Sequence, residues 1–199
     1  TSTNLTLNNN VIATETLTSG NAGHATLTAD TITSTNALIQ GETLGAGEGA
    51  DITLVAEAIS LSGTIINSST EGRGVGGFIS FSGESIVIED GSAIETDALG
   101  EGNGGHIIMN ARNSFSLSDA IIEAETKGSG LGGLIEIQAP DIFLGQQGEI
   151  NISALSGTGD AGELTITGTN LTLSNHVIAT ETLTAGTACL LYTSPSPRD

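Results

Sequence analysis

A glycine-rich turn followed by alternating apolar residues recurs along the chain, and this repeat constrains the fold more than any other feature. The six complete copies read GNAGHATLTA, GEGADITLVA, GVGGFISFSG, GNGGHIIMNA, GLGGLIEIQA and GDAGELTITG, and they begin at Gly20, Gly47, Gly74, Gly102, Gly130 and Gly159. A seventh copy begins at Gly186, so successive copies are 27 to 29 residues apart. Self-similarity at a period of this size predicts a repeat architecture in which each unit packs on its neighbours.

Each unit contains three short segments with a strand-like pattern. In the first segment apolar residues alternate at Ala25 and Leu27, Ile52 and Leu54, Ile79 and Phe81, Ile107 and Met109, Ile135 and Ile137, and Leu164 and Ile166. In the second they alternate at Ile59 and Leu61, Ile86 and Ile88, Phe115 and Leu117, Ile142 and Leu144, and Leu171 and Leu173. The third begins with Ile12, Ile39, Ile66, Ile94, Ile122, Ile150 and Ile178. A period of two with one apolar face predicts half-buried strands, and no segment is long enough to be a helix.

Three short strands cannot bury their apolar faces alone, but they can do so when one coil stacks on the next. We therefore predict an all-β fold over residues 1–188, a right-handed parallel β-helix (β-solenoid) with three short strands per coil. Each strand would hydrogen-bond to its counterpart one repeat away. Coils spaced about 4.8 Å apart would make a rod of roughly 30–35 Å.

Small residues recur at two further positions of the repeat. The first column is Ala29, Ala56, Gly83, Ala111, Ala139 and Gly168, directly after the first strand. The second column is Gly23, Gly77, Gly105, Gly133 and Gly162, with Ala50 as the exception. We predict a tight corner at the first column and positive φ at the second. One extra residue enters each of IEDGSA, NARNSF and SGTG, and we expect these insertions to lie in turns.

The charge balance excludes two classes of partner. The net charge is −19, with four Lys and Arg residues against 23 Asp and Glu residues. The chain therefore lacks the basic stripe that neutralises nucleic-acid phosphates, and an anionic membrane surface would repel it. No apolar run is long enough for a transmembrane helix, so we expect no membrane insertion. The 37% of apolar residues, many of them Ile, Leu and Val, argue against disorder.

An acidic column recurs once per coil, about five residues before the turn glycine, and we expect it to face outward. Its members are Glu15, Glu42, Ser69, Asp97, Glu125, Ser153 and Glu181. Stacked carboxylates repel, and Ca²⁺ with its preference for oxygen ligands could relieve the repulsion. The alternative is an acidic face that keeps the rod soluble. We assign no metal site and leave open whether Glu15, Glu42, Asp97, Glu125 and Glu181 bind calcium.

No combination of residues points to catalysis. His24 and His106 share one phase of the repeat, but Asp51, Phe78, Leu134 and Glu163 share it too, and His176 lies in a turn. Nucleophilic catalysis needs a nucleophile, a base and an orienting group together. The basic residues Arg73, Arg112 and Lys127 occupy three different phases and do not line one cleft. We therefore expect no enzyme, no catalytic residue and no cofactor.

The units GNGGHIIMNARNSFSLSDAIIEAETKGSG and GDAGELTITGTNLTLSNHVIATETLTAG resemble the repeat region of filamentous-haemagglutinin-like exoproteins of the two-partner secretion class. The shared pattern is a glycine-rich turn, then I-x-I-x-A, then a strand ending near SLS-x-x-A-x-I, and it covers residues 1–188. The resemblance implies an extracellular or cell-surface bacterial protein and an outer-membrane barrel transporter as partner. It also implies a structural rod or stalk of an adhesin, with the chain a fragment open at both ends. A host-cell or surface glycan or protein would be the target, which the sequence does not name. The alternative is a carbohydrate-binding or polysaccharide-cleaving β-helix domain, because right-handed β-helices also host such proteins.

The last eleven residues, CLLYTSPSPRD at 189–199, do not follow the repeat. Aligned with the first coil, Cys189 takes the place of Gly23, and no alternation continues beyond it. The segment resembles a translated sequencing-library adapter. We therefore exclude residues 189–199 from the fold as a non-native tail and expect them to be disordered, with a genuine disordered tail as the alternative.

Overall fold

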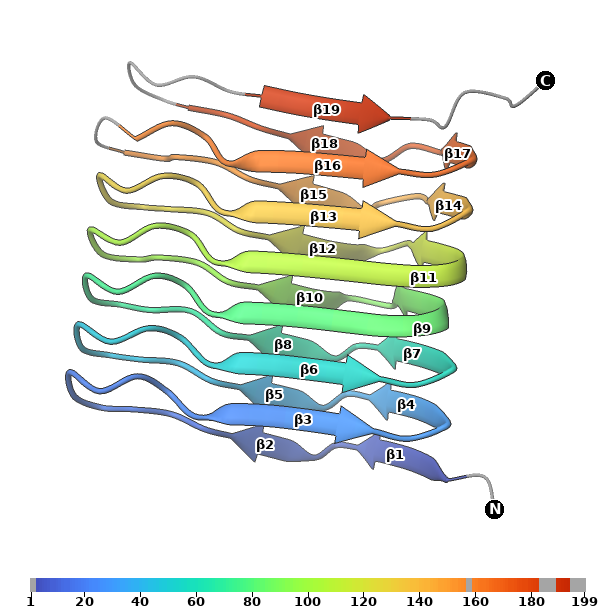
Figure 1. The fold of residues 1–199 in the computed structure, drawn as a ribbon, viewed down its shortest axis with the longest axis horizontal. Helices are drawn as coiled ribbons and strands as arrows, with labels where there is room; N and C mark the ends of the chain where they lie inside the picture. The colour runs from blue at the N-terminus through green and yellow to red at the C-terminus, as the bar shows by residue number, and fades with distance from the viewer. Residues whose placement is uncertain (1–2, 157–158, 183–188, 194–199) are drawn as a thin grey trace.

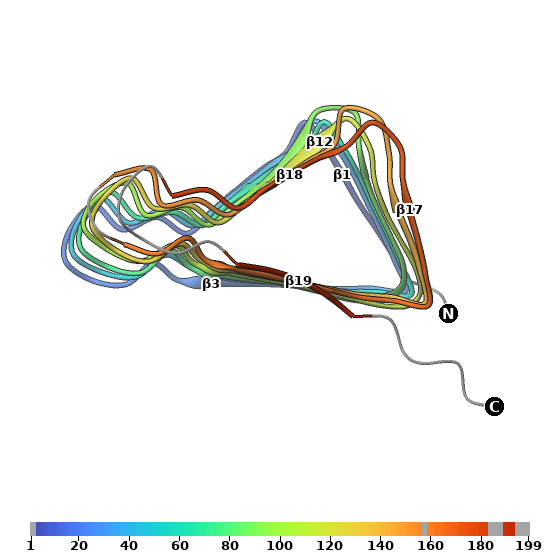
Figure 2. The ribbon, with the colours of Figure 1, turned by 90° about the horizontal axis from the view of Figure 1, so that it is seen from above.

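The predicted parallel β-helix is the fold of the molecule. The computed structural model describes residues 3–156, 159–182 and 189–193, and all of its strand pairs are parallel. The strands form one twelve-stranded sheet and one seven-stranded sheet. Within each sheet, strands of successive coils follow one another along the axis of the solenoid (Figure 1). Seen with the C-terminal end toward the viewer, the chain winds counterclockwise as it approaches, so the solenoid is right-handed (Figures 1 and 2).

Each coil contributes to three rows of strands. The first row is β3 (His24–Thr28), β6 (Asp51–Val55), β9 (Phe78–Glu89), β11 (His106–Leu117), β13 (Leu134–Gln138), β16 (Glu163–Thr167) and β19 (Cys189–Thr193). The second is β1 (Asn4–Asn8), β4 (Thr31–Thr35), β7 (Ala58–Ser62), β14 (Asp141–Leu144) and β17 (Asn170–Leu173). The third is β2 (Val11–Ala13), β5 (Leu38–Gln40), β8 (Ile65–Asn67), β10 (Ser92–Glu95), β12 (Ala120–Glu123), β15 (Glu149–Asn151) and β18 (Val177–Ala179). Strands β9 and β11 run through the first corner, which joins the first two rows into one sheet.

Viewed along the axis, the coils that are described throughout have a triangular body and a smaller lobe, with a narrow waist between them (Figure 2). The three rows of strands surround the body. The lobe is formed by the glycine-rich turns between the third row and the first row of the next coil. At the waist the two walls of one coil are hydrogen-bonded to each other, as when the N–H of Gly105 donates to the carbonyl of Thr96 at 2.6 Å.

The core consists of the predicted inward columns except near the C-terminal end, where Leu171 is partly buried and Leu173 is 56% exposed. Ile52, Ile79, Ile107, Ile135 and Leu164 follow one another in register through the first row, and each is fully buried. The isoleucines of the third row stack in the same way. Stacking equivalent side chains removes their apolar surface from water, which contributes about 25 cal/mol of favourable free energy per Å² buried.

The column of small residues after the first strand forms the predicted tight corner. Ala56, Ala111 and Ala139 are buried there. A Cβ atom on Gly83 would lie 2.5 Å from the carbonyl oxygen of Ala56, so larger residues would force successive corners apart. The second glycine column needs a different explanation from the one predicted. None of its glycines has positive φ, and they lie instead at the waist, where a Cβ on Gly105 would be 2.2 Å from the oxygen of Gly77.

Positive φ occurs at another turn of the repeat, between the second and third rows. The residues concerned are Asn9, Asn36, Gly63, Asp90, Gly91, Asp119, Gln147 and Asn175. Asn, Asp and Gly tolerate this conformation better than other residues. The predicted insertion in IEDGSA lies at a turn of this kind, at Asp90 and Gly91. The predicted insertion in NARNSF lies at the first corner, where the pairing of β11 with β9 shifts between Ala111 and Ser114. Two residues of SGTG, 157–158, lie outside the described residues.

The start of the tail differs from the expectation. Cys189–Thr193 form β19, which pairs in parallel with β16. Its register sets Cys189 opposite Glu163, one place further along the repeat than the alignment with Gly23, so that Leu190 is opposite Leu164. The open edge of β16 offers unpaired backbone groups, and a segment in extended conformation satisfies them whatever its sequence. The expected disorder is therefore not found at Cys189–Thr193, and residues 194–199 lie outside the described residues.

Candidate functional site

The acidic column stacks as predicted, but it does not face solvent along its whole length. The residues that follow its members form a continuous series of bridges from Thr16 to Thr182. Glu15 and Glu181 are exposed at the two ends, whereas Asp97 and Glu125 are only 7% and 5% exposed. The outward expectation is wrong for these two residues. Figure 2 shows that the backbone outline bends inward at the waist. Asp97 and Glu125 directly follow Thr96 and Ala124, whose carbonyls accept the waist hydrogen bonds, and we call the position of these two buried residues the crease.

A second column, polar in every coil except the two at its ends, runs beside the first, two residues earlier in each coil. It consists of the last residues of the third-row strands, Ala13, Gln40, Asn67, Glu95, Glu123, Asn151 and Ala179. Sequence reasoning missed this column because it considered only one acidic position per coil. The signal was present in two consecutive repeats, as Glu95-Thr96-Asp97 and Glu123-Ala124-Glu125.

Where both columns are acidic, four carboxylates meet across two neighbouring coils, and we call Glu95, Asp97, Glu123 and Glu125 the acidic cluster. One carboxylate oxygen from each of Asp97, Glu123 and Glu125 lies within 4.8 Å of the others. Glu95 is paired with Glu123 in the register of β10 and β12. Oδ1 of Asp97 accepts a hydrogen bond from the main-chain N–H of Glu125 at 3.0 Å.

The surroundings of the acidic cluster disfavour the ionised form of its carboxyl groups. Burial, followed by repulsion from neighbouring carboxylates, raises the pKa of Glu123 to about 7. Burial and the carboxylate of Asp97 likewise raise the pKa of Glu125 to about 7, although Lys127 opposes the shift. Burial also raises the pKa values of Glu95 and Asp97. A bound cation would favour the ionised form of all four groups.

Neutral oxygen-bearing side chains close the acidic cluster on both sides. On the coil before it, Asn67 donates from Nδ2 to Glu95 at 3.4 Å, and Oγ of Ser69 accepts from the N–H of Asp97 at 3.0 Å. On the coil after it, Ser153 donates to Oδ1 of Asn151 at 2.6 Å. The acidic column is therefore not a continuous ladder of charge, and its carboxylates come together at one place.

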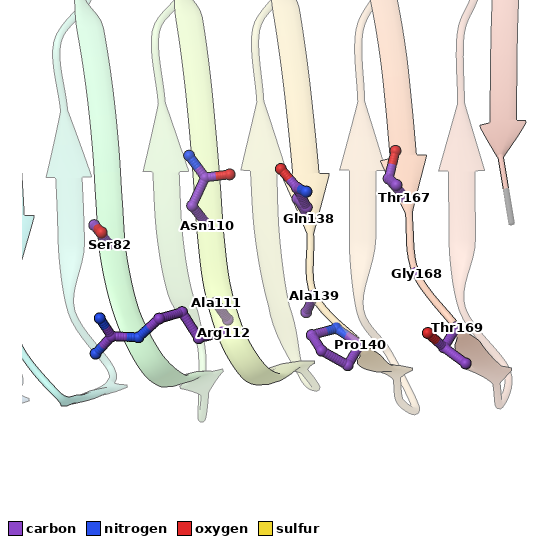
Figure 3. Close-up of a pocket in the computed structure, with 10 residues that line it drawn as sticks. All are labelled: Ser82, Asn110, Ala111, Arg112, Gln138, Ala139, Pro140, Thr167, Gly168 and Thr169. Carbon is purple, nitrogen blue, oxygen red and sulfur yellow. The ribbon is translucent and has the colours of Figure 1, made fainter. Parts of the chain in front are cut away.

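A shallow groove of about 490 Å³ lies at the first corner, on another face of the coils. Figure 3 shows Ser82, Asn110, Gln138 and Thr167 side by side on four successive strands, in a row that crosses the coils. Arg112 extends along the edge of this row toward β9, where it lies 3.4 Å from a carboxylate oxygen of Glu84. The row offers hydroxyl and amide groups on a regular spacing, which suits hydrogen bonding to an extended polar ligand.

The other charged side chains mainly connect neighbouring coils. His24 lies 3.1 Å from Asp51 and Arg73 lies 3.0 Å from Glu101, and both pairs are exposed. The register confirms that His24 and His106 share one phase. Nδ1 of His176 lies 3.3 Å from the carbonyl of Gly145, and burial lowers the pKa of this histidine.

Comparison of the chain with models of protein families, with curated proteins and with solved structures finds no match. The part of the chain that the structure describes contains no helix that could span a membrane.

Proposed function

We propose that this chain is a structural rod or stalk segment of a secreted or surface-exposed bacterial exoprotein of the adhesin type. The observation that carries the proposal is the uninterrupted stacking of the coils. Most inward positions are apolar in coil after coil, with the buried Ser34 between Leu7 and Leu61 as an exception, so that the chain builds length and presents regular faces. A role in projecting or spacing an adhesive surface follows from that regularity.

The repeat pattern supports the export route. Its resemblance to filamentous-haemagglutinin-like exoproteins implies secretion through an outer-membrane barrel transporter. Stability without disulfides fits a rod whose coils are held by backbone ladders and apolar columns, since residues 1–188 contain no cysteine. The net charge of −19 would keep such a rod soluble and limit lateral association.

Antibodies against the purified segment test the proposed location. They are expected to label intact cells of the source bacterium, and brief protease treatment of intact cells should remove the signal. Deleting the barrel transporter encoded with the parent protein should abolish labelling. Labelling that requires permeabilised cells would contradict the proposal.

The groove at the first corner supports a second candidate function, carbohydrate binding. A glycan array would test it, with Asn110→Ala and Gln138→Ala expected to weaken binding and Thr26→Ala, on an exposed position of β3, as the matched control. Equal binding by all variants would exclude the groove as the binding surface. Release of new reducing ends from a polysaccharide would instead favour the cleaving enzyme.

A further inference from the structure

Two adjoining hollows form a continuous groove along the waist, on the wall that faces away from the acidic column. One hollow has a volume of about 560 Å³ and the other of about 190 Å³, and both are lined by Val75 and His106. We call this depression the waist groove. Glycines form its floor, and the residues on either side of them form its two walls. It shares no lining residue with the groove at the first corner.

The two walls of the waist groove carry the same pattern of residue types. One wall is a column in register at the start of the first-row strands, Asp51, Phe78, His106, Leu134 and Glu163. The other wall is the column of residues that directly precede the floor, Glu48, Val75, Asn103, Leu131 and Asp160. In both columns the two end members are acids and the three between them are not.

The middle of the waist groove presents apolar surface to solvent on successive coils. Leu131 is 49% exposed, and Val75 and Phe78 are half-buried. Covering these side chains with a ligand would remove apolar surface from water, which is favourable. Asn103 and His106 lie in the same stretch, and both can hydrogen-bond to polar groups of a ligand. This part of the groove therefore suits a chain with apolar side chains and a polar backbone.

The acids at the two ends of the waist groove favour a ligand with positive charges. All four of them are exposed, and the whole chain has a net charge of −19, which attracts cationic partners from a distance. The same charge repels a second copy of the chain and an anionic membrane surface. The nearby Arg73 is paired with Glu101 at 3.0 Å.

The distance between the acidic ends sets the length of the ligand. The ends are four coil spacings apart, which is roughly 19 Å at about 4.8 Å per coil. An extended peptide advances about 3.3 Å per residue, so that about six residues would reach from one end to the other.

We propose that the waist groove binds an extended segment of a partner protein, apolar in its middle and with Lys or Arg at both ends. The apolar residues cover Val75, Phe78 and Leu131, and the basic residues lie beside the acids of the two ends. The segment therefore runs along the axis of the solenoid and contacts several coils at once. This surface is separate from the rod function proposed above and does not depend on it.

The acetylated and amidated peptide Lys-Leu-Val-Thr-Leu-Lys is the probe, titrated into the whole chain by calorimetry. We expect a Kd on the order of 0.1 mM, because six residues cover less surface than a stable interface does. The peptide Lys-Gly-Ser-Thr-Gly-Lys has the same charge without the apolar middle and should bind at least about fivefold more weakly. Equal binding of the two peptides would show attraction by charge alone and overturn the proposal.

Leu131→Ser tests the apolar part of the groove. It should weaken binding of the first peptide about fivefold and change the melting temperature little, since half of the side chain is already exposed. Leu99→Ser is the matched control, because Leu99 is 41% exposed and lines neither hollow. Equal affinities of these two variants would overturn the proposal.

Glu48→Gln combined with Glu163→Gln tests the acidic ends. This variant should bind more weakly, and its affinity should depend less on NaCl between about 0.1 and 0.5 M. Glu57→Gln combined with Asp119→Asn removes the same charge from exposed positions outside the waist groove and should bind as the unmodified chain does. Equal loss in both double variants would contradict the role of the ends. Binding of maltohexaose that Leu131→Ser abolishes, with no binding of the peptide, would assign the groove to a carbohydrate instead.

Discussion

At the scale of single residues, the same amino-acid type has different roles at different positions of the repeat. Ile107 and Ile108 are neighbours in β11, but Ile107 is fully buried between the equivalent residues of two coils, whereas Ile108 is only half-buried on the outer face. The alternation of the strand alone sets this difference. It was predictable from the sequence because side chains at successive positions of a strand point to opposite faces.

Replacing Ile107 with Asp should unfold several coils. The new carboxylate would lie in the apolar interior without a partner, which should lower the free energy of unfolding by about 4 kcal/mol or more. Ile108→Asp is the matched control and should cost roughly 1 kcal/mol. Chemical denaturation of both variants measures the difference, and equal stability of the two would show that the inward assignment is wrong.

Gly105 and Gly91 require glycine for different reasons. Gly105 lies at the waist, where a Cβ atom would be 2.2 Å from a backbone oxygen of the neighbouring coil and 2.7 Å from the side chain of Thr96. Gly91 has a φ of 79°, but a Cβ atom there would meet nothing within 4 Å. One position is restricted by packing of backbone on backbone, and the other only by its own conformation.

Alanine substitutions should separate these two reasons. Gly91→Ala should cost about 1–2 kcal/mol, the strain of an L-residue in the left-handed region. Gly105→Ala should cost more, about 3 kcal/mol or above, because neither the backbone nor Thr96 can move away without breaking the waist hydrogen bond. Denaturant midpoints of the two variants measure this order. The opposite order would mean that the waist can open.

At the scale of elements, the ends of β10 and β12 bring several carboxylates close enough to repel one another. Those strands place Glu95 and Glu123 next to each other, and the residues that follow add Asp97 and Glu125 in the crease. The charged groups around them are Glu42, Lys127, Glu149 and Glu181, of which only Lys127 is positive. The folded state therefore holds protons that the unfolded chain releases at lower pH.

The stability of the protein should fall as the pH rises from about 4.5 to about 7. The pKa values of Glu123 and Glu125 are raised from 4.5 to about 7 in the folded state, so that in this window the folded chain binds more protons than the unfolded chain. Stability decreases with pH wherever that is true. Melting curves in buffers free of divalent ions across this range measure the effect, and Glu123→Gln combined with Glu125→Gln should flatten it. A Tm that rises through the window would contradict the raised pKa values.

At the scale of the whole molecule, stability comes from interfaces between neighbouring coils. Backbone ladders and apolar columns run the length of the solenoid, and the exposed ion pairs His24–Asp51, Arg73–Glu101 and Arg112–Glu84 each join one coil to the next. Exposed pairs of this kind contribute about 0–1 kcal/mol each, so the columns dominate. In such a repeat each unit contacts only its neighbours, and units can be removed one at a time.

Deleting residues 51–77 should remove one coil and leave a folded, shorter rod. The deletion joins Ala50 to Phe78, which occupies the same register position as Asp51, so the columns close again. Small-angle scattering should show a rod shorter by about 4.8 Å, the spacing of neighbouring strands. A deletion of half that length should disrupt the fold because it would bring second-row residues against first-row residues. Similar melting of the two deletions would contradict the nearest-neighbour description.

The sequence by itself determined the solenoid, its three rows of strands and most of its core, because the period of the repeat and the alternation of each strand are properties of neighbouring residues. Only the tertiary structure decided what lies across the coil. The waist, the crease around Glu125 and the approach of Glu123 to Asp97 depend on how the turns bend two distant segments together. We expected the waist glycines to have positive φ. The structure shows that glycine is needed there because the backbone of the neighbouring coil occupies the place of a side chain. The register of β19 was also decided there, since pairing with β16 moved it one residue from the sequence alignment.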